Sequence, residues 1–584
     1  MRVFYWEDSI MKRKMRKGFA FYLAVVMVPV CMLTGCGGTA KMETTDMEAE
    51  YDVSGEVYEE PFETGQVYEA PAEIVAEGEV AEMVVADEAA VVGMTENFMS
   101  GVPRGMYDDD FSGEGMPEFN TEEYNAEKET GFAKVSQSPL STFSADVDTA
   151  SYSNLRRMIE DGYSLEDIPE GAVRIEEILN YFNYDYNLPE GKEPFGVTTE
   201  IADCPWDKEH KLLSIGLKTE EIDFSESSQS NLVFLLDVSG SMDDRDKLPL
   251  LQRAFGVLAD NLTEKDRVSI VTYAGDDKVL LEGVRGDKTE EIREVLNDLQ
   301  AGGSTNGSKG IETAYELAEE FFIEGGNNRV ILATDGDLNV GTTSESELTK
   351  LIEEKRESGI YLTVLGFGTG NIKDNKMEAL ADNGNGNYAY IDSLGEAKKV
   401  LVEEMGSTLV TVAKDVKFQV EFNPEKVSEY RLIGYQNRRM EAQDFIDDTK
   451  DAGEIGAGHT VTALYEIVLK EGDEKTDSGL KYSETITNGS DEWLTISIRY
   501  KEPDEDESIL LQYPVDDSSY TNAPSDDWQF AAAAAEFGLV VTDSSYMGEA
   551  SLENVKDRLS KLELEEDDYK EEFYGLVKKL DRNS

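Results

Sequence analysis

The chain has 584 residues, with 122 Asp and Glu against 54 Lys and Arg, and its formal net charge is −68. A charge this negative repels phosphate backbones and argues against nucleic-acid binding. Three cysteines and two histidines exclude a disulfide framework and a thiolate zinc cluster, and they leave little material for imidazole-based catalysis. The chemistry of this chain therefore has to come mostly from oxygen atoms.

Residues 1–35 have the features of an export signal. Five basic residues between positions 12 and 17 precede an apolar run, residues 19–33, that is shorter than the roughly 20 residues of a membrane-spanning helix. The run ends in Leu33-Thr34-Gly35-Cys36, which resembles the bacterial lipobox, a motif whose cysteine thiol is diacylated. The resemblance implies lipidation of Cys36 with palmitate-type chains and anchoring to the extracytoplasmic face of a bacterial membrane. An uncleaved signal anchor is the alternative.

Residues 36–137 are expected to form an acidic, disordered tether. Between positions 41 and 130 there are 26 acidic residues and three basic ones, without a sustained apolar period of 2 or 3.6. Self-repulsion extends such a segment, so it suits a spacer between a membrane and a folded part. An acidic docking tail is the alternative interpretation.

Order is expected to begin near Pro139. Residues 138–190 are predicted to form an N-terminal helical segment, because apolar residues at positions 173–182 recur at helical spacing. Residues 191–229 are predicted to form a β segment of a flanking domain, with strand-like runs at 195–201 and 212–217.

Residues 230–412 alternate expected strands with expected helices. The run 232–236 is apolar throughout, as in a strand buried on both faces of a parallel sheet. Further strands are expected at 267–273, 279–284, 329–333 and 361–366, and helices at 250–262, 289–299, 311–322 and 344–355. This alternation predicts a Rossmann-like α/β fold, a mostly parallel sheet with helices on both faces.

Residues 413–525 are expected to be rich in strands without intervening helices, as in an antiparallel sandwich. Residues 526–584 return to helical patterns and are predicted to form a C-terminal helical segment. Because strands both precede and follow the α/β unit, we expect that unit to be inserted in a β-sandwich-like domain built from both flanks.

The clearest chemical motif follows the expected strand 232–236. Asp237, Ser239 and Ser241 stand at positions i, i+2 and i+4, and Gly240 allows a sharp bend between the serines. Ligand sites in open α/β sheets lie beyond the carboxyl ends of the strands. Carboxylate and hydroxyl oxygens suit magnesium, manganese or calcium rather than zinc. Taken alone, the pattern also fits a helix N-cap.

Two further loops offer oxygen ligands at comparable positions. A glycine-rich loop carries Thr305 into an expected helix, and the expected buried strand 329–333 delivers Asp335 near its carboxyl end. With the D-x-S-x-S motif, these residues resemble the metal-ion-dependent adhesion site of von Willebrand factor type A (VWA) domains.

The resemblance implies a role for each of the five residues. Ser239, Ser241 and Thr305 would coordinate a cation through their hydroxyls, while Asp237 and Asp335 would coordinate mainly through water. Such a cation stays under-neutralised and keeps an open position, which a Glu or Asp of a protein partner fills in the family. The implied cofactor is Mg²⁺, with Mn²⁺ or Ca²⁺ as alternative ions.

Other segments resemble the YfbK-type bacterial lipoproteins. They are residues 139–152, 334–341, 430–435 and 451–459. This likeness extends over roughly residues 138–580 and does not identify what is bound. It implies a membrane-anchored binding protein of the cell envelope with an adhesion site for divalent cations.

The alternatives are a scaffold or assembly subunit of an envelope complex and a metal-dependent hydrolase. Ser239 lacks the G-x-S-x-G context of a hydrolase nucleophile, and metal-dependent hydrolysis needs more carboxylates and a general base. Cys204 has no second thiol to resolve it after processing, so a buried apolar role is expected. His210 is expected at the surface or a sandwich edge, and the aromatic run 181–186 in a core rather than on a carbohydrate platform. We therefore expect a protein that is not an enzyme.

Overall fold

The computed structural model describes residues 121–584, apart from 146–147, 221–228, 304–307, 337–344, 405–409, 451, 471–488, 504 and 506. These described residues belong to one compact unit, Phe111–Ser584. The predicted export signal, Cys36 and most of the predicted tether lie outside the described residues, as does Thr305. No helix within the described ranges is long and apolar enough to cross a membrane.

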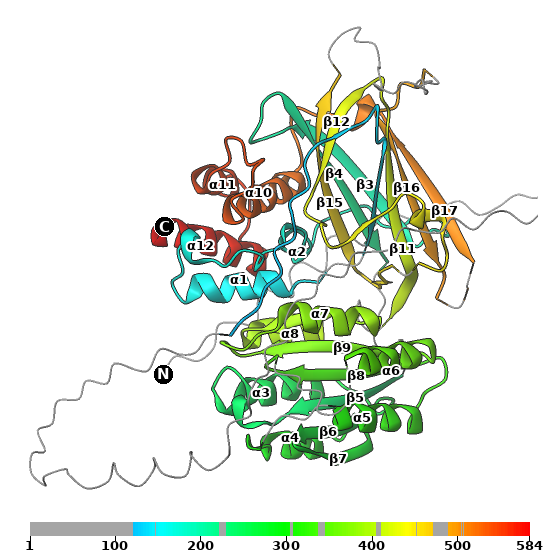
Figure 1. Ribbon diagram of the computed structural model, residues 1–584, viewed down its shortest axis with the longest axis vertical. Coiled ribbons are helices and arrows are strands. Elements are labelled where there is room, and N and C mark those ends of the chain that lie inside the picture. The colour runs from blue at the N-terminus through cyan, green and yellow to red at the C-terminus, as the bar shows by residue number, and fades with distance from the viewer. Residues whose placement is uncertain are drawn as a thin grey trace, which may run out of the picture. The chain divides into compact units, whose positions relative to one another are not determined.

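The inserted α/β domain is built on a six-stranded sheet with the order β10-β9-β8-β5-β6-β7 in the described chain (Figure 1). Its strands are β5 (Ser230–Asp237), β6 (Arg267–Ala274), β7 (Asp276–Arg285), β8 (Asn327–Thr334), β9 (Ile360–Phe367) and β10 (Tyr388–Ile391). All neighbouring pairs are parallel except β6 and β7, which are antiparallel. The prediction of a mostly parallel sheet is confirmed.

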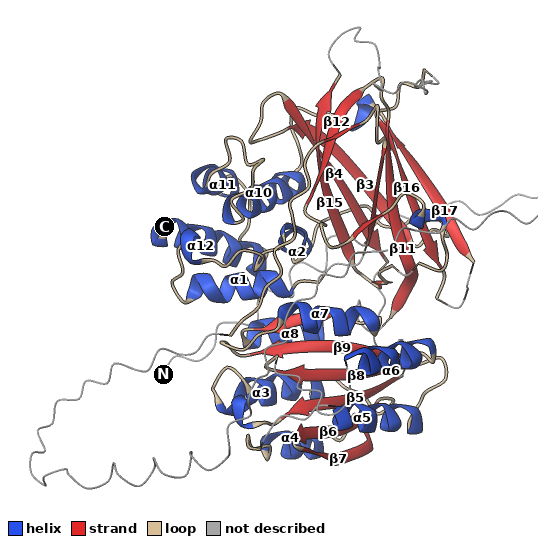
Figure 2. Cartoon of the chain, in the orientation of Figure 1, coloured by secondary structure: helices blue, strands red, loops and turns tan. Residues whose placement is uncertain are grey.

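Helices cover both faces of this sheet (Figure 2). They are α3 (Leu248–Ala259), α4 (Thr289–Asn297), α5 (Ser308–Glu320), α6 (Glu345–Glu357), α7 (Asp374–Asn383) and α8 (Leu394–Lys398). In β5, Val233 and Leu235 pack toward α5, α6 and α7, whereas Leu232, Phe234 and Leu236 pack toward α3, α4 and α8. Successive strand residues point to opposite faces, so burial on both faces requires the unbroken apolar run.

The flanking β domain has two sheets, ordered β1-β12-β15-β4-β3 and β13-β2-β11-β16-β17, with β14 paired to β11. Its strands are β1 (Ala133–Lys134), β2 (Leu140–Ser144), β3 (Phe195–Asp203), β4 (His210–Thr219), β11 (Thr411–Phe422), β12 (Val427–Ile433), β13 (Arg439–Met440), β14 (Ile455–Gly456), β15 (Thr460–Leu469), β16 (Leu494–Lys501) and β17 (Ser508–Val515). The two sheets bury one shared apolar core. In both sheets, strands from before the α/β domain pair with strands from after it, such as β4 with β15 and β2 with β11. The predicted insertion is therefore confirmed.

Helices from the two ends of the described chain share a separate core. They are α1 (Ala150–Glu160), α2 (Ile175–Asn180), α10 (Asp526–Val541), α11 (Leu552–Leu559) and α12 (Asp568–Asn583). Phe182, for example, packs edge-on against Phe530, with ring centroids 4.9 Å apart. Tyr181, Tyr184 and Tyr186 are buried as well, so this aromatic run is part of the core rather than a carbohydrate platform.

Two expectations about the start of the ordered chain need correction. The segment predicted to be helical contains β2, which pairs with β11 because Phe143 fills the sandwich core. The predicted tether is too long at its C-terminal end. Val135 is buried in the same core, and Glu122 and Glu129 form ion pairs with the folded part. Tertiary partners therefore order this acidic segment despite its weak local pattern.

Candidate metal centre

The carboxylate of Asp237 lies buried at the carboxyl end of β5, and both of its oxygens accept hydrogen bonds. Oδ1 accepts the backbone N–H of Ser239 at 2.8 Å, and Oδ2 accepts the hydroxyl of Thr334 at 3.1 Å. Thr334 ends the neighbouring strand β8, so the two parallel strands together fix the orientation of this side chain. Parallel strands end at the same edge of a sheet, which is why this pairing forms there.

The hydroxyls of Ser239 and Ser241 lie 2.9 Å apart just beyond the same edge. Ser239 is buried and Ser241 is exposed, so the pair reaches from the sheet to the solvent. The short 3-10 helix Gly240–Asp243 follows β5 and keeps the two serines adjacent. The predicted grouping of Asp237, Ser239 and Ser241 at one sheet edge is therefore present in the structure.

The glycine-rich loop docks against this motif. The N–H of Gly240 donates to the carbonyl of Gly303 at 3.2 Å, and the N–H of Gly302 donates to the carbonyl of Val238 at 2.8 Å. Gly303 has φ +92°, and a Cβ there would lie 2.6 Å from the carbonyl oxygen of Ala274, so the close approach requires glycine. Thr305 itself lies outside the described residues.

Asp335 follows β8 and is buried, and its Oδ2 lies 3.0 Å from the Nζ of Lys247. Sequence reasoning missed Lys247, because a lysine just before a helix is usually a solvated residue. Its aliphatic chain lies against Gly368, where a Cβ would come within 2.2 Å of it. Thus Gly368 makes room for the lysine that pairs with Asp335.

The electrostatics of the centre favour a bound cation. Burial raises the pKa of Asp237 to about 6, and the negative charge of Asp335 adds to this shift. Two buried carboxylates near one ammonium leave a net negative charge in a poorly solvated place, which a divalent ion would relieve. The side chains of Asp237, Ser239, Ser241 and Asp335 offer hard oxygens, the donor type that suits a divalent cation of the Mg²⁺ or Ca²⁺ class.

The histidines belong to the flanking β domain and not to this sheet edge. His210 begins β4, and the backbone N–H of His459 donates to the hydroxyl of Thr219, also in β4, at 3.0 Å. The Ser239 hydroxyl instead faces that of Ser241. Cys204 is buried, and burial raises the pKa of its thiol to about 12, which suits the expected apolar role.

A cavity of about 1110 Å³ opens elsewhere, lined in part by residues 125–129, 541–546 and α7. Its arginines are already neutralised by carboxylates. Arg174 pairs with Asp374 at 2.8 Å, and Arg438 pairs with Glu378 at 3.1 Å. These ion pairs hold the inserted α/β domain to the remainder of the unit. The arginines that line the cavity therefore have a structural role.

Comparison with known families divides the chain in agreement with the structure. Residues 231–403 match the model described as "von Willebrand factor type A domain", and residues 407–582 match "Uncharacterized protein YfbK, C-terminal". Residues 118–214 match a further model described as "von Willebrand factor".

The protein YfbK of Escherichia coli (strain K12) is 41% identical over 460 residues, which is 77% of this chain and 79% of that protein. Human inter-alpha-trypsin inhibitor heavy chain H3 is 28% identical over 262 residues, and the match spans 41% of this chain but 29% of the heavy chain. The solved structure of a von Willebrand factor type A protein from Catenulispora acidiphila is 15% identical, with a TM-score of 0.37, and covers 66% of this chain and 89% of its own. The E. coli relative and the two adjoining family matches show that this chain belongs to the YfbK family of VWA-domain proteins.

Proposed function

We propose that this protein is a membrane-anchored, extracytoplasmic binding protein that captures an acidic residue of a protein partner through a divalent cation. The observation that carries this proposal is the pair of buried carboxylates, Asp237 and Asp335, beside the Ser239 and Ser241 hydroxyls at one sheet edge. Family membership supports a role in protein interaction.

The charges of the centre explain why an acidic group would bind there. Asp237, Asp335 and the ammonium of Lys247 together carry one negative charge, so the centre alone repels a carboxylate. A divalent cation changes that balance to one positive charge, and an incoming Glu or Asp would then neutralise it. Capture is therefore expected only with the metal bound, even though the whole chain is strongly acidic.

The hydroxyls of Ser239, Ser241 and Thr305 are proposed to coordinate the ion directly. Asp237 and Asp335 are proposed to coordinate it mainly through water. Neutral oxygen donors leave most of the charge of the ion available to the partner. Mg²⁺ is the proposed ion because it suits hard oxygen ligands and keeps exchangeable water positions.

The anchor is proposed to be Cys36, lipidated after removal of residues 1–35. Two acyl chains give stable membrane attachment, where a single chain gives marginal binding. The acidic segment that follows would hold the folded part away from the membrane surface. Palmitate labelling that persists in a Cys36→Ala variant would contradict the anchor without affecting the proposed metal centre.

The metal centre is tested with Ser241→Ala and Thr305→Ala, and Asp243→Asn is the control because it is exposed in the same short helix. Calorimetric titration with Mg²⁺ should show binding by the wild type and the control and a loss of at least tenfold in affinity for both variants. Capture of a protein from envelope extracts should need Mg²⁺ and disappear with EDTA. Equal Mg²⁺ affinity in all four proteins would contradict the assigned centre.

A further inference from the structure

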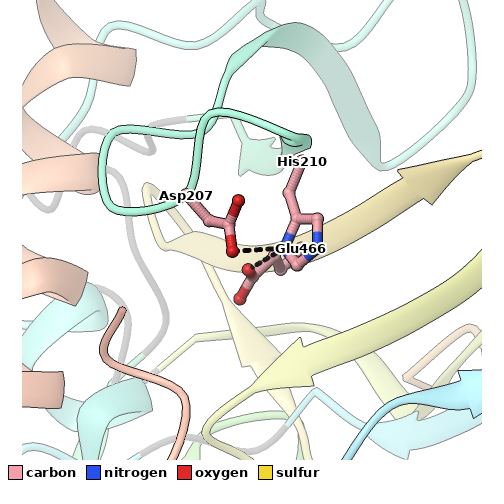
Figure 3. Close-up of side chains that lie close together, drawn as sticks. All are labelled: Asp207, His210 and Glu466. Carbon is pink, nitrogen blue, oxygen red and sulfur yellow. Dashed lines mark hydrogen bonds and ion pairs between the residues drawn. The ribbon is translucent and has the colours of Figure 1, made fainter. Parts of the chain in front are cut away.

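A second group of ligand-type side chains lies in the flanking β domain (Figure 3). Asp207 lies in the turn between β3 and β4, His210 is the first residue of β4, and Glu466 lies on β15, the neighbour of β4. His210 pairs in register with Val468, two residues from Glu466, so His210 and Glu466 point to the same face of the sheet. The α/β domain is inserted between these two parts of the chain.

The three side chains converge on the imidazole. Nδ1 of His210 lies 2.5 Å from Oε1 of Glu466 and 3.7 Å from Oδ2 of Asp207. Figure 3 shows both carboxylates directed at this nitrogen. One ligand-type atom from each residue lies within 4.8 Å of the other two.

The other polar atoms of the two carboxylates are held by neighbours. Oδ1 of Asp207 accepts the backbone N–H of Glu209 at 3.0 Å. Oε2 of Glu466 accepts the Arg431 guanidinium at 2.7 Å and the Trp206 indole N–H at 3.3 Å. Such contacts orient metal-binding carboxylates in known sites, because they leave one oxygen of each group directed at the ion.

The local charges also suit a divalent ion. Arg431 lies 2.7 Å from Glu466 and 3.4 Å from Glu129, and Asp207 adds a third carboxylate beside the imidazole. With a neutral imidazole, these four charged groups carry two net negative charges, in a place where Glu466 and Arg431 are almost fully buried. A divalent cation would neutralise them.

We infer that Asp207, His210 and Glu466 form a second metal site, for a transition-metal ion of the zinc class. An imidazole with two carboxylates selects zinc-like ions over Mg²⁺ and Ca²⁺, which prefer oxygen alone. In the bound state the ion would take the place of the hydrogen between Nδ1 and Glu466, and the neutral imidazole would carry its single proton on Nε2. This site is separate from the hard-oxygen centre at the end of β5 and does not depend on the function proposed for it.

The geometry requires only small movements. Ligand bonds of about 2.0–2.2 Å place the ligand atoms of a tetrahedral site about 3.3 Å apart. The distance between Nδ1 of His210 and Oε1 of Glu466 therefore has to increase by less than about 1 Å. Asp207 is 37% exposed and lies in a turn, so its side chain can move to complete the site, and water can take the remaining position. The bound ion would fasten the turn before β4 to β15, joining the two flanks of the inserted domain.

The test uses the full chain in detergent with saturating Mg²⁺, titrated with ZnCl₂. The variants are His210→Gln and Asp207→Asn, and the control is Glu209→Gln, an exposed residue of the same turn. The wild type and the control are expected to bind one Zn²⁺ per chain at this site. The Zn²⁺ affinity of the site should be at least tenfold lower in either variant, so that each variant binds one ion fewer. Zn²⁺ should also raise their melting temperatures by several degrees and leave those of the variants unchanged.

Two further variants separate this site from other ligands. Ser241→Ala should lose Mg²⁺ affinity and retain the Zn²⁺ site, which distinguishes the failure of one site from that of the other. Equal Zn²⁺ binding by folded His210→Gln and wild type would overturn the inference. Loss of the Zn²⁺ in Cys204→Ser together with its retention in His210→Gln would assign the ion to the buried thiol and would overturn it as well.

Discussion

The ammonium of Lys247 lies 3.0 Å from a carboxylate oxygen of Asp335, and both side chains are almost fully buried. This contact places a fixed positive charge next to the residues proposed to hold a divalent cation. A fixed positive charge beside the centre opposes metal binding and, once the metal is bound, attracts a carboxylate. The lysine therefore has opposite effects on the two steps of the proposed function.

Replacing Lys247 with Met should separate these two steps. Removal of the ammonium should tighten Mg²⁺ binding by about tenfold, because the repulsion between the ammonium and the cation, on the order of 1 kcal/mol, is lost. Capture of an acidic partner should weaken, because the metal-loaded centre becomes neutral. Calorimetry with Mg²⁺ and pull-down at saturating Mg²⁺ measure the two effects.

The same variant should be less stable without metal. Breaking a buried ion pair costs about 3–5 kcal/mol because the remaining charge stays unpaired. Mg²⁺ should restore part of that stability by pairing with Asp335. Lys288→Met, at an exposed position of the same domain, is the control and should change none of these measurements. Parallel changes in metal binding and capture would contradict the proposed role of Lys247.

Gly368→Ala should disturb the centre from outside its ligand set. Gly368 has φ +76°, and its added Cβ would lie 2.2 Å from the side chain of Lys247. Gly370→Ala is a matched control, because Gly370 has φ +82° and nothing within 4 Å of the added Cβ. We expect a loss of about 1 kcal/mol from backbone strain in both variants and a further 1–3 kcal/mol from overpacking in Gly368→Ala alone. Urea unfolding measures both, and equal losses would contradict the packing argument.

Two adjacent glutamates near the start of the described chain should differ in their contributions to stability. The Glu122 side chain is 4% exposed, accepts the Gly370 N–H at 2.8 Å and pairs with Arg157, whereas that of Glu123 is 73% exposed and pairs with Lys373. Glu122→Gln is expected to cost about 1–3 kcal/mol of unfolding free energy, and Glu123→Gln at most about 1 kcal/mol. Hydrogen exchange at Gly370 should accelerate only in the first variant. The reverse order of effects would show that the segment is not fastened through Glu122.

His459 should make stability depend on pH in the acid range. Burial lowers the pKa of this imidazole from 6.5 to about 4, with Lys399 adding to the shift. The unfolded chain therefore binds one more proton than the folded chain between these values, so the contribution is complete above pH 6.5 and is lost as the pH falls toward 4. His459→Asn should remove this part of the dependence. Chemical unfolding of both proteins from pH 4 to 8 gives the difference, and a constant difference would contradict the prediction.

Several features were predictable from local patterns. The apolar run of β5, buried on both faces, placed Asp237 at the edge of a parallel sheet, and the spacing of Ser239 and Ser241 followed from the motif. Strands on both sides of the α/β unit indicated an inserted domain, which the pairing of β4 with β15 confirms. Such features depend on the periodicity of strands and helices and on residues that are close to one another in the sequence.

Strand β2 and the ordered segment before it were not predictable, because their stability comes from partners far along the chain. Phe143 is buried against Phe418, and Glu129 pairs with Arg431. Short segments without a strong period adopt the conformation that tertiary contacts impose on them. An acidic composition alone therefore suggested a longer tether than the fold allows.

The amino-acid sequence by itself determined the α/β insertion and the oxygen-rich loop at Asp237, since periodicity and neighbouring residues suffice for both. Only the tertiary structure decided that Lys247 faces Asp335 and that His210 meets Glu466, which stands 256 residues later. The reason is that packing brings such pairs together, and no local pattern records which distant side chain will share a buried space.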